Sequence, residues 1–151
     1  MLTYKDLMAD DWVRLVDPYY KDLALQVLWA EDDGVRLKHS VGSDYGERVP
    51  KRYDIRSKCD YAEIEQISLD RSLLERIGFK DDGMYAFMDL GDQKYAKYYH
   101  HLHRFEVIWE GMDDRANDTY QRDVIYCATV STVDELQHAF KLTHLNVEVK
   151  L

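Results

Sequence analysis

The stretch "SLDRSLLERIGF" at residues 68–79 predicts a complete short helix with both of its ends. Asp70 is a suitable N-cap, because its carboxylate accepts hydrogen bonds from backbone N–H groups that the first turn leaves unpaired. The apolar stripe expected of a helix that packs on one side is formed by Leu73, Leu74 and Ile77. Gly78 stands where a left-handed residue ends a helix without a Cβ penalty, and Phe79 then folds back onto the last turn.

Before this helix, apolar residues recur at every second position, which is the pattern of strands. We expect strands at 12–16, 23–29, 35–41 and 61–69. The two middle strands flank Asp32-Asp33-Gly34, a turn signal that predicts a hairpin. In the second strand, Trp29 should share the buried face with Leu25 and Val27. An SH3-like small barrel is the expected arrangement of these short strands.

After the helix the β pattern returns, and we expect strands at 84–90, 98–110 and 123–130. Thr132 and Glu135 form a capping box that opens a helix to about Leu142, and the alternating residues of 144–151 would add a fourth strand to the three, so we expect three or four strands in the second half. Because strands mostly follow strands, the class is α+β, with a mostly antiparallel sheet and two short helices in the second half. We expect a β-rich lobe over 1–68 and an α+β lobe over 69–151, with one compact domain as the alternative.

The chain is acidic, with a net charge of −9 from 29 acidic and 20 basic residues. Such a balance repels a phosphate backbone, so nucleic-acid binding is disfavoured. The most basic stretch, 49–58, would bind a nucleic acid through Lys51, Arg52, Arg56 and Lys58, but a solvated loop is the more ordinary interpretation. No apolar run approaches the ~20 residues that span a bilayer, and the N-terminal residues lack a signal-peptide pattern. We therefore expect a cytoplasmic protein that does not bind membranes.

A cluster of histidines offers the sharpest chemical signal in the chain. His100, His101 and His103 fall on the predicted strand 98–110, where His101 and His103 would point to the same face. Two imidazoles suit a zinc ion, which needs further ligands. The candidates for those ligands are His39, His138, His144 or a carboxylate, and the spacing selects none of them. The alternative is that these histidines pack as half-buried polar residues at the end of an aromatic strand face.

Twelve tyrosines and three tryptophans are a high number for 151 residues. Aromatic side chains outside a core are typical of protein interfaces, because they bury a large area at a low entropic cost. We take Tyr19, Tyr20 and Tyr98 as candidates for protein binding. The alternative is that the tyrosines cover a thin core. The expected partner is a protein, and a homodimer is one form that this pairing would take.

Catalytic motifs are absent: the sequence has no nucleophile elbow, phosphate-binding loop, H-E-x-x-H motif or glycine-rich dinucleotide turn. We therefore assign no catalytic residue and expect no cofactor other than the zinc ion considered above. Cys59 and Cys127 fit no C-x-x-C pattern and should be reduced in the cytoplasm. Cys127 lies in an apolar run, which favours an inert thiol in the core.

Three stretches resemble, in the same order, a family of small proteins from Bacteroidetes genomes and their phages or mobile elements: "DLMADDWVRL" (6–15), "EIEQISLDRSLLERIGF" (63–79) and "VDELQHAFKLTHL" (133–145). The matching positions are Leu7, Trp12, Val13, Ile67, Leu69, Leu74, Gly78, Phe79, Leu136, Gln137, Phe140, Leu142 and Thr143. The chain departs from the family where Asp10 and Asp11 replace Gly-Asn and where Asp134 replaces a histidine. The family has no assigned activity, so the resemblance implies no catalytic residues.

Together these patterns favour a non-enzymatic protein-interaction module of phage or mobile-element origin. The alternative hypothesis is a small metal-binding protein, or a metal-dependent enzyme, that uses His101 and His103. Neither hypothesis names the partner or the biological process.

Overall fold

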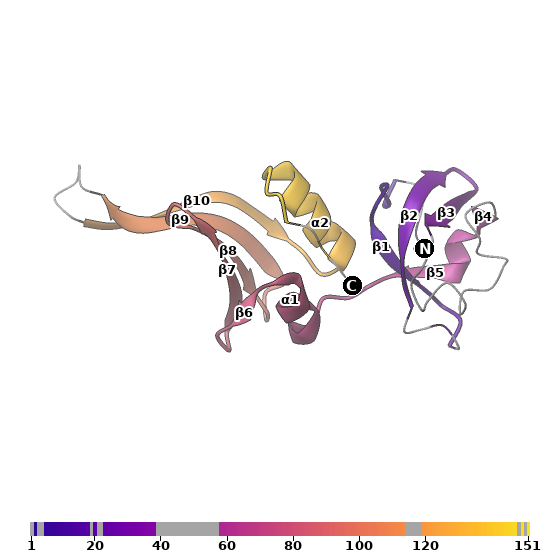
Figure 1. Cartoon of the computed structure of the whole chain (residues 1–151), viewed down its shortest axis with the longest axis horizontal. Helices are drawn as coiled ribbons and strands as arrows, with labels where there is room; N and C mark the ends of the chain where they lie inside the picture. The colour runs from indigo at the N-terminus through magenta and orange to yellow at the C-terminus, as the bar shows by residue number, and fades with distance from the viewer. Residues whose placement is uncertain are drawn as a thin grey trace. The chain divides into compact units, whose positions relative to one another are not determined.

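Two antiparallel sheets of five strands each are the main elements of the structure (Figure 1). The structure is a computed structural model, and it describes residues 2, 5–18, 20, 23–38, 58–113, 119–147, 149 and 151. The chain divides into two units, each with one of the sheets. The first unit is Met1–Ser68 with Thr132–Asp134, and the second is Leu69–Ser131 with Glu135–Leu151. Among the described residues, no helix is long and apolar enough to cross a membrane.

The strands of the first unit lie in the order β4-β3-β2-β1-β5. They are β1 (Trp12–Leu15), β2 (Ala24–Glu31), β3 (Gly34–Lys38), β4 (Lys58–Cys59) and β5 (Ile64–Gln66), with the 3-10 turn η2 (Tyr61–Glu63) before the last. The alternating residues Leu25, Val27 and Leu37 of the predicted hairpin are buried in one cluster together with Val13 of β1. The predicted strand at 61–69 is shorter than expected, because its first part is the 3-10 turn. The SH3-like barrel stays a prediction.

Trp29 does not lie on the buried face of β2, so its predicted position is wrong. Its side chain is 43% exposed, and its Nε1 donates to Glu31 Oε1 over 2.9 Å. The register between β2 and β3 shifts between Val27 and Trp29, which makes Leu28 the extra residue of a β-bulge. A bulge reverses the alternation of side chains beyond it, and Trp29 therefore points outward.

The second unit carries its strands in the order β10-β9-β8-β7-β6, with one helix before them and one after. The elements are α1 (Arg71–Ile77), β6 (Lys80–Asp81), β7 (Tyr85–Gly91), β8 (Lys94–Tyr99), β9 (Arg104–Asp113), β10 (Thr119–Thr129) and α2 (Val133–Leu142). The ring of Phe140 on α2 contacts Phe105 of β9, at 5.5 Å between centroids, and Phe79, which follows α1, at 6.3 Å. Both helices therefore pack on the sheet face that carries Phe105. The predicted α+β class is confirmed.

The ends of α1 confirm the helix predicted within residues 68–79. Asp70 Oδ1 accepts a hydrogen bond from the Leu73 N–H over 2.8 Å. Gly78 is left-handed at φ 115°, and its N–H donates to Leu74 O and Glu75 O. In α2 the four predicted inward residues are buried, namely Val133, Leu136, Ala139 and Phe140.

The structure differs from the expected strands of the second half at two places. The run 98–110 is not one strand, because β8 ends at Tyr99 and β9 begins at Arg104 after a tight turn. The residues 145–147 form no strand, although Leu145 and Val147 are half-buried on either side of the exposed Asn146, and Val149 is buried. An alternating pattern reports which side chains are buried, but a strand also needs a neighbour for its backbone.

Candidate functional site

The histidine cluster lies in the hairpin turn between β8 and β9 rather than on a strand. The alternation that would place the imidazoles of His101 and His103 on one face therefore does not apply to them. His103 is left-handed at φ 46°, and its Nδ1 lies 3.0 Å from the Tyr98 hydroxyl, while His100 Nε2 lies 3.1 Å from Asp81 Oδ1. No group of three His, Cys, Asp or Glu in the described part of the chain is arranged to hold a metal ion. Zinc binding by His101 and His103 stays a prediction.

For Tyr98, one of the three tyrosines proposed for protein binding, the structure corrects the expected position at the surface. Its side chain is 2% exposed, and its hydroxyl donates to Val130 O over 3.0 Å, so it is a core residue. Tyr20 is half-buried against the core of the first unit. Tyr19 falls outside the described residues. A buried Tyr98 therefore cannot contribute to the proposed protein-binding surface.

The basic stretch considered for nucleic acids is described only at its end. Lys58 Nζ lies 2.5 Å from both Glu31 Oε2 and Asp33 Oδ1, so two carboxylates already surround this cation. The other three candidates, Lys51, Arg52 and Arg56, fall outside the described residues.

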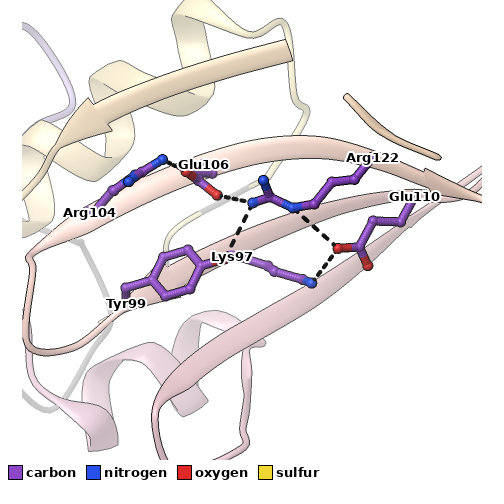
Figure 2. Close-up of polar contacts among 6 residues, drawn as sticks. All are labelled: Lys97, Tyr99, Arg104, Glu106, Glu110 and Arg122. Carbon is purple, nitrogen blue, oxygen red and sulfur yellow. Dashed lines mark hydrogen bonds and ion pairs between the residues drawn. The ribbon is translucent and has the colours of Figure 1, made fainter. Parts of the chain in front are cut away.

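A network of charged side chains occupies the sheet face of the second unit that points away from Phe105. We call this face the open face, because neither α1 nor α2 packs on it. Figure 2 shows the network, which consists of Lys97, Tyr99, Arg104, Glu106, Glu110 and Arg122. Arg122 is central to it: its Nη2 is 2.6 Å from Glu106 Oε2, and its Nε is 3.5 Å from Glu110 Oε1. Lys97 Nζ donates to Glu110 Oε1 over 2.9 Å.

Glu106 is the most buried member of the network, with 1% of its side chain exposed. Arg104 pairs with its Oε1, although that oxygen has no hydrogen bond of regular geometry. Burial is the largest single effect on Arg122 and opposes its charge, but the charges of Glu106 and Tyr99 and the hydrogen bonds to both together outweigh burial and raise the pKa of Arg122. Burial is also the largest single effect on Lys97 and opposes its charge, yet the hydrogen bond and charge of Glu110, together with the charges of Tyr85 and Tyr99, outweigh burial and raise the pKa of Lys97. Both cations therefore stay charged near neutral pH, which suits a fixed structure better than proton transfer.

This network was not predicted from the sequence, although the chain carries a signal for it. In "RFEVIWE" (104–110), charged residues alternate with Phe105 and Val107 at the start of the strand. Charges at every second position of an otherwise apolar strand indicate one face without a helix against it. Assigning one long strand through the histidines hid that pattern.

Strand β10 forms one edge of this sheet and is 11 residues long. Three of its apolar side chains are well exposed: Tyr120 at 60%, Val124 at 46% and Ile125 at 55%. Cys127 is exposed as well, which corrects its predicted place in the core. Figure 1 shows β10 pairing with β9 along a hairpin that extends past the other strands of this sheet. We call the outer side of β10 the β10 edge.

The backbone of β10 has a defined direction along this edge. The Glu110 N–H donates to Gln93 O over 2.9 Å, so the backbone groups of Glu110 point toward β8. Arg122 is directly opposite Glu110 in the ladder with β9. Opposite residues of an antiparallel ladder either exchange both hydrogen bonds or exchange none, so the N–H and C=O of Arg122 point outward. By alternation, those of Tyr120 and Val124 point outward too.

Comparisons of the chain with protein-family models, with curated proteins and with solved structures find no significant match. Its function is therefore inferred from the residues of the chain itself.

Proposed function

We propose that this chain is a protein-interaction module rather than an enzyme, and that it binds its partner at the β10 edge. An added strand would extend the sheet of the second unit by hydrogen bonding to the outward groups of Tyr120, Arg122 and Val124. Exposed apolar side chains beside those groups would supply the area that stabilises the complex. A location in the cytoplasm, and an origin in a phage or mobile element, belong to the same proposal and rest on sequence patterns alone.

The observation that carries this proposal is the contrast between β10 and the other three sheet edges. Among the described residues, the edges of the first sheet are β4, with 2 residues, and β5, with 3 residues. The far edge of the second sheet is β6, with 2 residues that are both charged and exposed. Short and charged edges are how proteins avoid unwanted strand pairing. At 11 residues, β10 departs from that rule.

The side chains of β10 give the edge little protection. The strand contains no proline, and its only basic residue is Arg122. The guanidinium of Arg122 is drawn onto the open face by Glu106 and Glu110, away from the outer side of the strand. A long edge without a proline or a lysine is expected to pair with another strand.

A photo-cross-linking experiment tests the proposal even though the partner is not identified. Ile125 is replaced by p-benzoylphenylalanine, and the full chain is expressed in its native cells and irradiated. We expect a discrete covalent adduct whose protein component is identified by mass spectrometry. Adding V124P should abolish the adduct, because proline removes an N–H that points outward and leaves the ladder with β9 intact.

The matched control places the same cross-linker at Met84, which is 73% exposed and lies outside β10. A position that is exposed but not at the edge should give no discrete adduct. Unchanged thermal unfolding of V124P would show that the fold is preserved. Equal adducts at Ile125 and Met84, or an adduct at Ile125 that survives V124P, would contradict the proposed function.

A further inference from the structure

The outward groups of β10 are not evenly spaced along the edge. Near its end, the Val130 N–H donates to His103 O over 2.7 Å, so Val130 faces β9. By alternation the backbone groups of Thr129 and Cys127 point outward. Toward the other end the nearest outward residue is Val124, three positions from Cys127 instead of two. The cause is the β-bulge at Ile125, where the register with β9 shifts.

This irregularity restricts which strand can pair with the whole edge. A regular strand presents its backbone groups at every second residue and matches β10 only on one side of the bulge. A strand with a bulge at the corresponding place matches β10 along its full length. The β10 strand of a second copy has that bulge, and antiparallel pairing places the two bulges opposite each other.

We propose that the occupant of the β10 edge is a second copy of this chain, paired antiparallel through β10 about a two-fold axis between Val124 and Ile125. The inference rests on the proposed function and names its partner. In this register Tyr120 is opposite the partner's Thr129, and Arg122 is opposite the partner's Cys127. Each pair joins two residues whose backbone groups point outward, so the hydrogen-bond ladder continues on both sides of the bulge.

The same register brings the exposed apolar residues of both copies together. Val124 and Ile125 lie next to the axis, so those of the partner meet them at the centre of the interface. Self-complementary contacts of this kind are what a two-fold interface requires. The strand itself carries one cation and one anion, Arg122 and Asp123, so the acidity of the whole chain is not concentrated at this edge. An axis perpendicular to the sheet also keeps the open faces of the two copies on the same side.

Sedimentation equilibrium and disulfide cross-linking test the inference on the full chain. We expect the wild-type chain to be a dimer and V124K to raise the dimer dissociation constant by roughly 100-fold, because two like charges would meet at the axis. The matched control is M84K, which adds the same charge to a residue outside β10 and should leave the dimer unchanged. For the register, Y120C/T129C in a C127S background should form disulfide-linked dimers. In this register, residue 120 of one copy and residue 129 of the other form a hydrogen-bonded pair. The Cα atoms of such a pair are about 5.5 Å apart, which is within the range of a disulfide.

The register control is Y120C with native Cys127 and Thr129, whose cysteines are not opposite each other and should form no linked dimer. A chain that sediments as a monomer at millimolar concentration overturns the inference, and so does a dimer that V124K leaves intact. Equal cross-linking of the register control also overturns it. If the chain is a monomer but cross-links through Ile125 to a different protein in cells, the proposed function stands and the second copy is excluded as its partner.

Discussion

Arg122 Nη2 lies 2.6 Å from Glu106 Oε2, although the two residues are not opposite each other in the β9–β10 ladder. Arg122 is opposite Glu110, and Glu106 is opposite Cys127. The bulge in β10 therefore separates the two partners, and the long arginine side chain reaches across it. Because Glu106 is 1% exposed, this contact compensates a carboxylate that water does not reach.

We predict that R122M lowers the free energy of unfolding by about 1–3 kcal/mol, because it leaves a buried carboxylate with Arg104 as its remaining cation. The double variant E106L/R122M should recover part of that loss, since it removes the carboxylate as well. Urea denaturation followed by circular dichroism measures both. The control is R14M, whose partner Glu65 is exposed, and which should cost less than about 1 kcal/mol. If R122M costs no more than R14M, Glu106 does not depend on Arg122.

The C-terminal cap of α1 gives a second prediction. Gly78 has φ 115°, a conformation that L-residues rarely adopt, and an added Cβ would meet only Met88 Cε at 3.4 Å. The cost of G78A should therefore come mainly from the backbone, and we expect a loss of about 1–2 kcal/mol in unfolding free energy. G78N should cost less, because asparagine tolerates left-handed conformations better than alanine. Equal stability of wild type and G78A would mean that the cap relaxes without strain.

These ends of α1 could be predicted because their signals are local. Asp70 and Gly78 act on backbone groups within one turn, so the sequence contains everything that decides them. The strand bulges could not be predicted in this way. Leu28 and Ile125 are extra residues only relative to the strands that pair with them, and the sequence does not specify that register.

The turn between β8 and β9 was missed for a related reason. It is made of His100, His101, Leu102 and His103, without a glycine, proline, asparagine or aspartate to mark it. His103 nevertheless takes the left-handed conformation, and its imidazole meets the Tyr98 hydroxyl. The turn therefore coincides with a contact across the hairpin, between Tyr98 and His103, and no residue type typical of turns marks it in the sequence. The β10 edge was missed too, because exposure at an edge depends on the order of strands in the sheet.

Asp81 leads to a prediction about pH. A hydrogen bond with His100 is the largest cause that lowers the pKa of Asp81, and a bond from the Gly83 N–H and the charge of Arg71 act in the same direction. A carboxyl whose folded pKa is depressed adds stability above its unfolded pKa of about 3.9, and that stability is lost as the pH falls through the folded pKa. D81N should therefore lose less stability than the wild type between pH 6 and pH 3, when each is unfolded by urea. Parallel losses in the two proteins would exclude Asp81 as a source of acid sensitivity.

The two cysteines should differ in reactivity, in contrast to what the sequence predicted for Cys127. Cys59 is buried, with Sγ 3.5 Å from both Asp60 O and Glu63 Oε2, whereas Cys127 is exposed. A thiol reagent such as Ellman's reagent should label one cysteine rapidly in the native chain and both after unfolding. C127S should abolish the rapid phase and C59S should leave it unchanged, if C59S retains the thermal unfolding transition of the wild type. A rapid phase that persists in C127S would show that the accessible thiol is Cys59 and would contradict this assignment.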